Sequence, residues 1–200
     1  MVKRKTRCHG STTAPKKARA TGTDEPPLSV AFLRAVNVGG RTVKMDVIAE
    51  HFRAMGFTRV STFLASGNVI FQVNGGDDIE GHIERYLAEH VGFSIPVMVR
   101  SKAAMEDVLR YIDGHTPPEA TTVHAMFAKT VLSDNQETIA SAWATESDSF
   151  ARATIDTLVW FAETTMSNSP CFNKPFEKLL GVPLTLRNAN TVRRLLAKMV

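Results

Sequence analysis

The chain has 200 residues, 44 % of them apolar, and 24 Lys+Arg against 20 Asp+Glu give a formal net charge of +4. This length and apolar content suit one large domain or two small ones with a packed core. No apolar run approaches the ~18–20 residues of a membrane span, and the basic start is not followed by the apolar segment of a secretory signal. We therefore expect a cytoplasmic protein with no membrane contact.

The excess of positive charge lies at the start of the chain. Residues 1–25 hold seven basic and two acidic residues, whereas the other 175 hold 17 basic and 18 acidic ones. Val2 is the only aliphatic residue larger than alanine in 1–27, so this segment cannot bury enough apolar surface to offset its ordering entropy. We predict a disordered basic tail over 1–27. A tail that contacts nucleic acid and a misassigned start codon both stay open as explanations.

The elements alternate in type from Leu28 onward. Apolar residues recur at helical spacing in two segments, and short runs of β-branched and aromatic residues lie between them. In chain order we expect strand 28–34, helix 44–55, strands 59–65 and 68–73, helix 77–91 and strand 95–100. This β-α-β-β-α-β order is that of the ferredoxin-like unit.

The second part of the chain repeats this order. After a helix at 102–112 we expect strand 122–130, helix 135–145, strands 149–154 and 157–163, helix 171–180, strand 183–187 and helix 190–199. Residues 97–101 align without a gap over 184–188, and the helices that follow share apolar positions. The prediction is an α+β fold of two ferredoxin-like units in tandem, with helices packed on antiparallel sheets. The folded domain spans 28–200, with halves at about 28–113 and 120–200.

The turn after the first strand combines glycines with cations. Gly39 and Gly40 allow backbone N–H groups to approach a ligand closely. Residues 35–42 approximate the phosphate-loop pattern G-x-x-x-x-G-K-[ST], but alanine replaces the first glycine and arginine the lysine, so we exclude an NTPase. A plain connecting loop is the alternative to an anion site here. The cations are Arg34, Arg41 and Lys44.

Two further polar turns are candidates for the same site. Ser66-Gly67-Asn68 joins two strands, where glycine and asparagine are also ordinary hairpin residues. Residues 187–191 (RNANT) separate the last strand from the last helix. Asn190 or Thr191 can cap that helix, while Arg187 can fork onto a carboxylate or phosphate of a ligand or pair with an acidic neighbour.

Three motifs in this order resemble those of a known family. They are 30–40 (VAFLRAVNVGG), 66–71 (SGNVIF) and 187–192 (RNANTV), and they resemble the domain of unknown function 1697 family over about residues 28–199. The resemblance implies a two-unit ferredoxin-like α+β protein. It brings no established activity, cofactor or substrate.

The chain departs from the family pattern at four positions. The family usually has glycine, glutamine, an aromatic residue and lysine where this chain has Ala35, Ala65, Ala189 and Pro170. The resemblance therefore implies that any family site is altered in this chain. The matching positions that survive are Arg34, Asn37, Gly39, Gly40, Ser66, Asn68, Ser169, Arg187, Asn188 and Asn190.

These residues, with Arg41 and Lys44, predict a loop cluster that binds a phosphate-bearing small molecule or nucleic acid. The motifs contain no carboxylate or histidine to act as a general base. A transferase or hydrolase acting on a phosphorylated substrate is the first alternative, so whether the protein is an enzyme stays open. Nucleic-acid contact by the basic tail alone is the second. We expect no metal site and no cofactor, and the oligomeric state stays open.

Overall fold

The structure is a computed structural model that describes residues 26–37, 42–73 and 75–200. Its first half contains, in order, β1 (Leu28–Leu33), α1 (Met45–Ala54), β2 (Thr58–Thr62), β3 (Asn68–Gln72), α2 (Ile79–Val91), β4 (Val97–Ser101) and α3 (Lys102–His115). Its second half contains β5 (Thr122–Ala128), α4 (Asp134–Ser141), β6 (Asp148–Thr154), β7 (Thr157–Ala162), α5 (Phe176–Leu180), β8 (Leu184–Asn188) and α6 (Ala189–Leu196). A short 3-10 turn, Met166–Asn168, precedes α5.

The strands form two antiparallel sheets of four strands each. Their orders are β2-β3-β1-β4 and β6-β7-β5-β8, so β4 and β8 are edge strands in equivalent positions. With the six α-helices of the described residues, this confirms the predicted α+β class and the antiparallel sheets. None of the helices in the described part of the chain has both the length and the apolar composition to cross a membrane.

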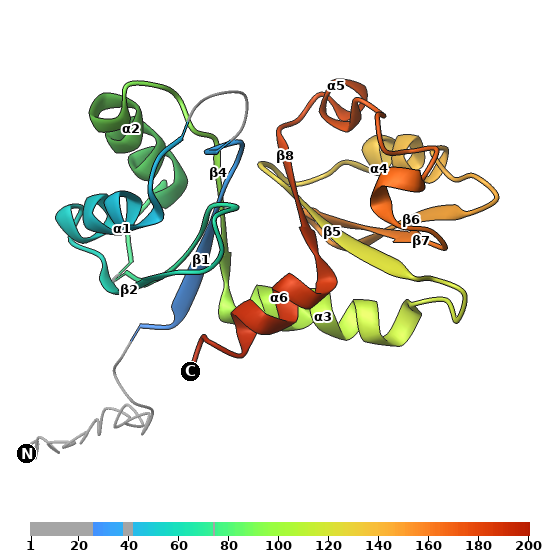
Figure 1. The fold of residues 1–200 in the computed structure, drawn as a ribbon, viewed down its shortest axis with the longest axis horizontal. Coiled ribbons are helices and arrows are strands. Elements are labelled where there is room, and N and C mark those ends of the chain that lie inside the picture. The colour runs from blue at the N-terminus through green and yellow to red at the C-terminus, as the bar shows by residue number, and fades with distance from the viewer. Residues whose placement is uncertain (1–25, 38–41, 74) are drawn as a thin grey trace, which may run out of the picture.

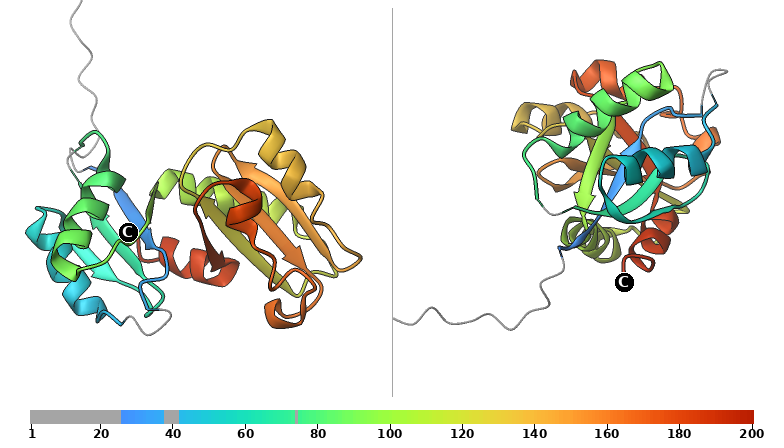
Figure 2. Two further views of the ribbon diagram at one scale, coloured as in Figure 1. Left: turned by 90° about the horizontal axis from the view of Figure 1, so that it is seen from above. Right: turned by 90° about the vertical axis from the view of Figure 1, so that its left-hand side faces the viewer.

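Helices cover the outer faces of the sheets, and the inner faces turn toward each other (Figures 1 and 2). Residues of α1 and α2 share a core with the first sheet, and residues of α4 and α5 share one with the second. Helices α3 and α6 lie side by side at one end, at the bottom of Figure 1. Each follows the edge strand of its own sheet and packs against both halves.

A third core lies between the two halves. It contains inner-face residues of both sheets together with Met105 of α3 and Val192 of α6. At its centre the rings of Phe32 and Phe127 stack with centroids 4.3 Å apart. Because one continuous apolar core joins residues from both sheets, we expect the halves to unfold together.

The helices that close this core follow from local sequence. In α3 the buried residues Met105, Val108, Leu109 and Ile112 recur at three- and four-residue spacing, which gives one apolar face. Ser101 caps the helix by accepting a hydrogen bond from the Ala104 N–H at 3.2 Å.

Most element boundaries differ from the sequence prediction by a few residues, and two of the differences have a clear local cause. Helix α5 has five residues instead of the predicted ten, because proline at 175 lacks the N–H group and the dihedral freedom that a continuing helix needs. Strand β2 ends at Thr62, and Leu64 beyond it has φ +59°, which is incompatible with an extended strand. The predicted tail lies outside the described residues except for Pro26 and Pro27.

Candidate functional site

Three of the predicted ligand-binding residues meet at one cavity. The cavity has a volume of about 400 Å³ and lies where β1, the β2–β3 turn and β8 converge. Asn37, Ser66 and Arg187 line it, and Asn68 lies directly behind. We call this the Arg187 cavity; its other lining residues are Leu33, Ala35, Val36 and Ala65.

Arg187 is buried, and its hydrogen bonds to the described residues all go to uncharged oxygens. Its Nε lies 2.5 Å from Asn68 Oδ1, and its Nη2 lies 2.9 Å from the carbonyl oxygen of Ser66. Further bonds reach Thr185 Oγ1 and backbone carbonyls at both ends of the bridge. Burial lowers the pKa of the Arg187 guanidinium to about 10, so the group still carries its charge at neutral pH.

The loops around the Arg187 cavity are held by side-chain amides. Asn37 donates from Nδ2 to the Ala65 carbonyl at 2.9 Å and accepts from the Val43 N–H at 2.8 Å. Asn68 donates to the Phe63 carbonyl at 2.7 Å and to Ser66 Oγ at 3.1 Å. These bonds fix the loops, in agreement with the structural explanation of the turn, and the binding explanation stays a prediction.

Ala35 lies on the rim of the cavity with φ +53°, where a side chain is strained. Left-handed backbone costs a non-glycine residue about 1–2 kcal/mol, and the extra unfolded-state entropy of glycine offsets about 0.5–1 kcal/mol of that. We therefore expect Ala35→Gly to raise the free energy of unfolding by about 0.5–1 kcal/mol in urea titrations. The control Ala103→Gly, in helical backbone of α3, should instead lower it by about 1 kcal/mol. If Ala35→Gly lowers the free energy of unfolding as Ala103→Gly does, the backbone at Ala35 is not strained.

Arg34 and Lys44 do not reach the Arg187 cavity. The Arg34 guanidinium forms an ion pair with Glu177 of α5, a residue from the second half. Lys44 is exposed at the start of α1, where its side chain makes no capping bond. The remaining predicted residues of this loop lie outside the described residues; they are Gly39, Gly40 and Arg41.

Asn188, the last residue of β8, caps helix α6. Asn188 Oδ1 accepts from the Asn190 N–H at 2.9 Å at the start of α6, and Asn190 Oδ1 accepts from Arg193. The sequence offered Asn190 or Thr191 as the cap of this helix, but the cap is Asn188, because the helix begins at Ala189, one residue earlier than predicted. Arg187 therefore bridges the halves, while its neighbours end the strand and begin the helix.

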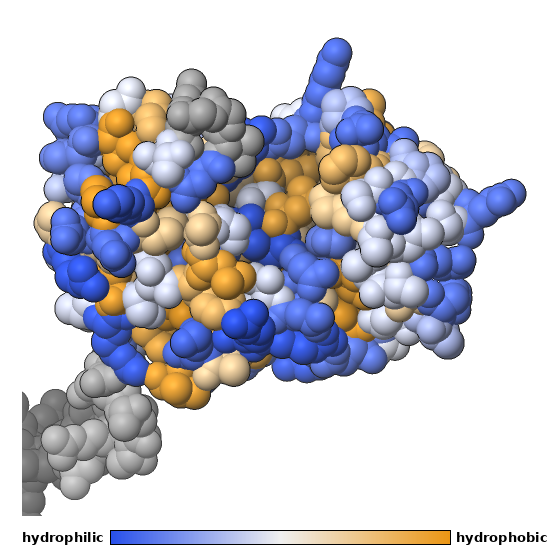
Figure 3. Space-filling model, viewed as in Figure 1, coloured by the Kyte–Doolittle hydropathy of each residue, from blue (hydrophilic) through white to orange (hydrophobic). Residues whose placement is uncertain are grey.

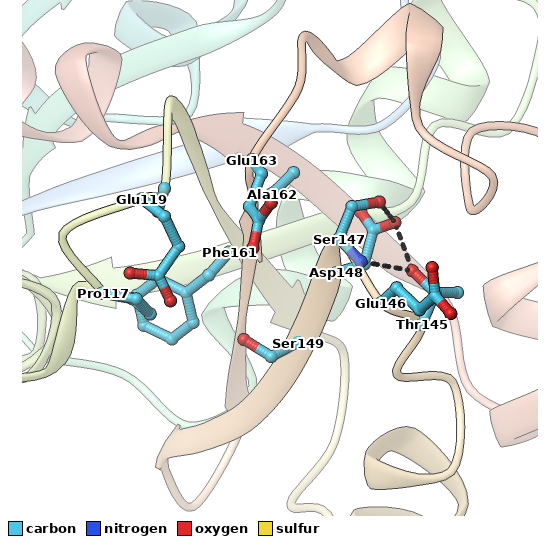
Figure 4. A pocket seen from close by; sticks show the side chains of 11 residues that line it. Pro117, Glu119, Thr145, Glu146, Ser147, Asp148, Ser149, Phe161, Ala162 and Glu163 are labelled. Atoms are coloured by element: carbon cyan, nitrogen blue, oxygen red, sulfur yellow. Dashed lines mark hydrogen bonds between the residues drawn. The ribbon is translucent and has the colours of Figure 1, made fainter.

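Ser169 belongs to a different part of the molecule. Its Oγ donates to Asp148 Oδ1 at 2.7 Å, and the same oxygen accepts from Trp160 Nε1 at 2.7 Å. Burial disfavours the charge on Asp148, but hydrogen bonds from Ser169, Trp160 and Thr145 outweigh burial and lower its pKa. Figure 4 shows Thr145 and Asp148 at a neighbouring cavity of about 130 Å³, too small for most ligands.

The two halves repeat the same backbone contacts. The Arg34 N–H donates to the Pro96 carbonyl at 2.9 Å, and the Lys129 N–H donates to the Pro183 carbonyl at 3.0 Å. In each case the donor follows the central strand and the acceptor precedes the edge strand. Arg100 on β4 is the equivalent of Arg187 on β8, as the ungapped alignment of these strands predicts.

The equivalent arginines differ in their acidic partners. Arg100 donates across the halves to the Ala128 carbonyl, and its guanidinium lies 3.2 Å from Asp156 Oδ2 and 3.6 Å from Glu80 Oε1. At Arg187, glycine stands in the turn position of Asp156, and no carboxylate of the described residues forms an ion pair with the guanidinium. Within the described part of the chain, the charge of Arg100 is neutralised by carboxylates, whereas that of Arg187 is not.

Comparison with known proteins agrees with the sequence motifs. Residues 28–156 match the family model described as a protein of unknown function, DUF1697. The chain belongs to the DUF1697 family. It is also similar to a solved structure, a conserved bacterial protein from Streptococcus pneumoniae, with a TM-score of 0.60 and 18 % identity over 87 % of this chain and 99 % of that one. No curated protein matches the chain.

At this level of identity the bacterial structure supports the fold of the DUF1697 chain and nothing about its chemistry. The chemistry follows from the Arg187 cavity, which combines one guanidinium, one amide and one hydroxyl with four aliphatic side chains. Its described lining contains no carboxylate, histidine or cysteine to move a proton. The arrangement can hold an anion beside an apolar group.

The acidic residues that distinguish Arg100 from Arg187 were not predicted from the sequence. Glu177 lies inside a segment predicted as one long helix, and Glu80 and Asp156 lie outside the three motifs. The alignment of 97–101 with 184–188 contained the signal, because it paired Arg100 with Arg187. The difference in charge between the surroundings of Arg100 and Arg187 is visible only in the folded chain, where Glu80 and Asp156 lie beside Arg100.

Proposed function

We propose that this DUF1697 protein binds a phosphate-bearing small molecule in the Arg187 cavity. The observation that carries the proposal is the buried guanidinium of Arg187, which lies beside a cavity and has no carboxylate partner among the described residues, whereas the equivalent Arg100 has two. A buried charge is costly unless an opposite charge compensates it. An anionic ligand would supply the compensation that Asp156 and Glu80 supply to Arg100.

Binding is favoured over catalysis and over nucleic acid. The described lining of the cavity has no group that serves as a general base near neutral pH. Trp143, Trp160 and Phe161 are buried, so these rings form no stacking platform for bases. Contact with nucleic acid through the basic tail remains a separate proposal, because the tail lies outside the described residues.

We also propose that each half is a ferredoxin-like unit, over about 28–113 and 120–200. The support is the βαββαβ order and the placement of the first strand of each half between the third and the fourth. The helix that follows each unit then packs between the halves, so the two units form one shared core.

The test closes the cavity without touching Arg187. Inorganic phosphate, adenosine monophosphate and a sugar phosphate are titrated into the full chain, and the melting temperature and heat of binding are measured. A ligand at 100 times its Kd adds about 2.7 kcal/mol to the stability of the wild type. Ala65 is exposed at the mouth of the cavity, so Ala65→Phe should fill it and abolish the response to ligand. Ala103→Phe, at an exposed position of α3 away from the cavity, should leave the response unchanged.

Two outcomes would contradict the proposed function. One is the absence of a response to any phosphate probe in the wild type. The other is an equal response in Ala65→Phe and Ala103→Phe, because binding would then occur elsewhere.

A further inference from the structure

Glu80 contacts both cations at the β4 edge of the first sheet, Arg100 and Lys129. One oxygen of Glu80, on α2, accepts from the Val99 N–H on β4 at 2.6 Å and lies 3.6 Å from Arg100 Nη1. The other oxygen lies 2.8 Å from Lys129 Nζ. Glu84, one turn later, accepts from the Val97 N–H at 2.7 Å. The open edge of β4 is thus closed by two acidic side chains.

The second half reproduces only one of these carboxylates. Glu177 on α5 accepts from the Leu184 N–H on β8 at 2.7 Å and pairs with Arg34, as Glu84 does with Val97 and Lys129. Four residues before Glu177, in the place of Glu80, stands Asn173, which is exposed and lies before α5 begins. The second acidic group is therefore missing at the edge of β8.

The groups that would hold this second carboxylate are present. Leu186 corresponds to Val99, and its N–H points to the same open edge of β8 as that of Leu184, since alternate residues of a strand share an edge. No side chain of the described residues accepts a hydrogen bond from it. Arg34 takes the place of Lys129, and Arg187 follows Leu186 as Arg100 follows Val99.

A cavity of about 380 Å³ occupies this place, which we call the α5–β8 cavity. Its walls combine three cations and one carboxylate with apolar side chains: Arg34, Lys174, Lys178, Glu177, Pro175, Phe176, Leu184 and Leu186. Lys174 and Lys178 form no ion pair with the described residues, so the lining has an excess of positive charge. Figure 3 shows apolar residues, in orange, next to hydrophilic ones in blue at the surface between the two halves.

We propose that the α5–β8 cavity binds the carboxylate of a short aliphatic acid, in the position that Glu80 occupies in the first half. One carboxylate oxygen accepts from the Leu186 N–H and the other pairs with Arg34, while the alkyl chain lies against Phe176 and Leu184. The site shares no lining residue with the Arg187 cavity, so the inference is independent of the proposed phosphate site.

The experiment titrates propionate and succinate into the 15N-labelled full chain and follows the backbone amide of Leu186 by NMR. We expect a saturable shift of this amide. Arg34→Gln should weaken the affinity at least about tenfold, because it removes the charged partner of the acid. The matched control Lys129→Gln removes a cation from the equivalent, already occupied place and should leave the affinity within about twofold.

A second variant covers the case in which Arg34→Gln fails to fold. The double variant Lys174→Gln/Lys178→Gln changes positions outside the core and should weaken the affinity about fivefold. The absence of a saturable Leu186 shift, unchanged affinity in both the Arg34 and the double-lysine variant, or equal loss in Lys129→Gln would each overturn the inference. Ala65→Phe should bind propionate normally, which separates the failure of this site from failure of the phosphate site.

Discussion

Replacing Arg187 by methionine is expected to lower the free energy of unfolding by about 3–5 kcal/mol, the cost of breaking a buried polar bridge. The guanidinium belongs to β8 in the second half but donates to Asn68, Ser66 and Gly67 in the first. Methionine keeps an apolar side chain of similar length, but it removes every donor and the guanidinium carbon that lies 5.2 Å from the centroid of the Phe32 ring. The buried Oδ1 of Asn68 then loses the hydrogen bond from Arg187, and the contact between the two halves weakens.

Urea unfolding of the full chain measures this effect, with Arg193→Met as the control. Arg193 also joins two elements, pairing with Asp113 of α3, but both side chains are largely exposed, and the expected loss is below about 1 kcal/mol. A loss below about 1 kcal/mol in Arg187→Met as well would show that the bridge contributes little. Because Arg187 combines this structural role with the proposed binding role, the binding test uses Ala65 instead.

The fold was predictable because its elements depend on local periodicity. The buried face of α3 and the alternation of helices and strands can be read from residues a few positions apart, and all eight strands and six helices of the described residues were expected. The main error, the length of α5, also has a local cause. Proline at 175 sits inside the segment predicted as a helix, and its effect on the helix outweighs the apolar spacing.

The candidate site was predictable only in part. The motifs that contain Asn37, Ser66 and Arg187 do meet, because strand ends of both sheets converge at one place. The partner of Arg34 was not predictable, since Glu177 lies 143 residues away and forms its contact only in the folded chain. Ser169 was assigned to the site through family resemblance alone, and its nearest polar partner, Asp148, lies elsewhere.

Replacing Gly67 by alanine is expected to lower the free energy of unfolding by about 1.5–4 kcal/mol, the sum of overpacking and of the backbone strain less the unfolded-state entropy of glycine. Gly67 has φ +78°, and an added Cβ would lie 2.8 Å from Val36 Cγ1 and 2.9 Å from the Leu33 carbonyl oxygen. Both neighbours belong to the lining of the Arg187 cavity. The turn must therefore shift, and its shift disturbs the carbonyls that accept from Arg187.

Gly56→Ala isolates the backbone part of this cost. Gly56 has a similar φ of +86°, but an added Cβ meets no atom within 4 Å, so the expected loss is about 0.5–1 kcal/mol, the backbone strain less the unfolded-state entropy of glycine. Thermal and urea unfolding of both variants measure the difference. Equal losses would mean that the packing around Gly67 yields without cost. A larger loss of stability in Gly67→Ala, together with a weaker response to phosphate, would show two roles for Gly67. It would stabilise the contact that Arg187 makes between the halves, and it would maintain the shape of the Arg187 cavity.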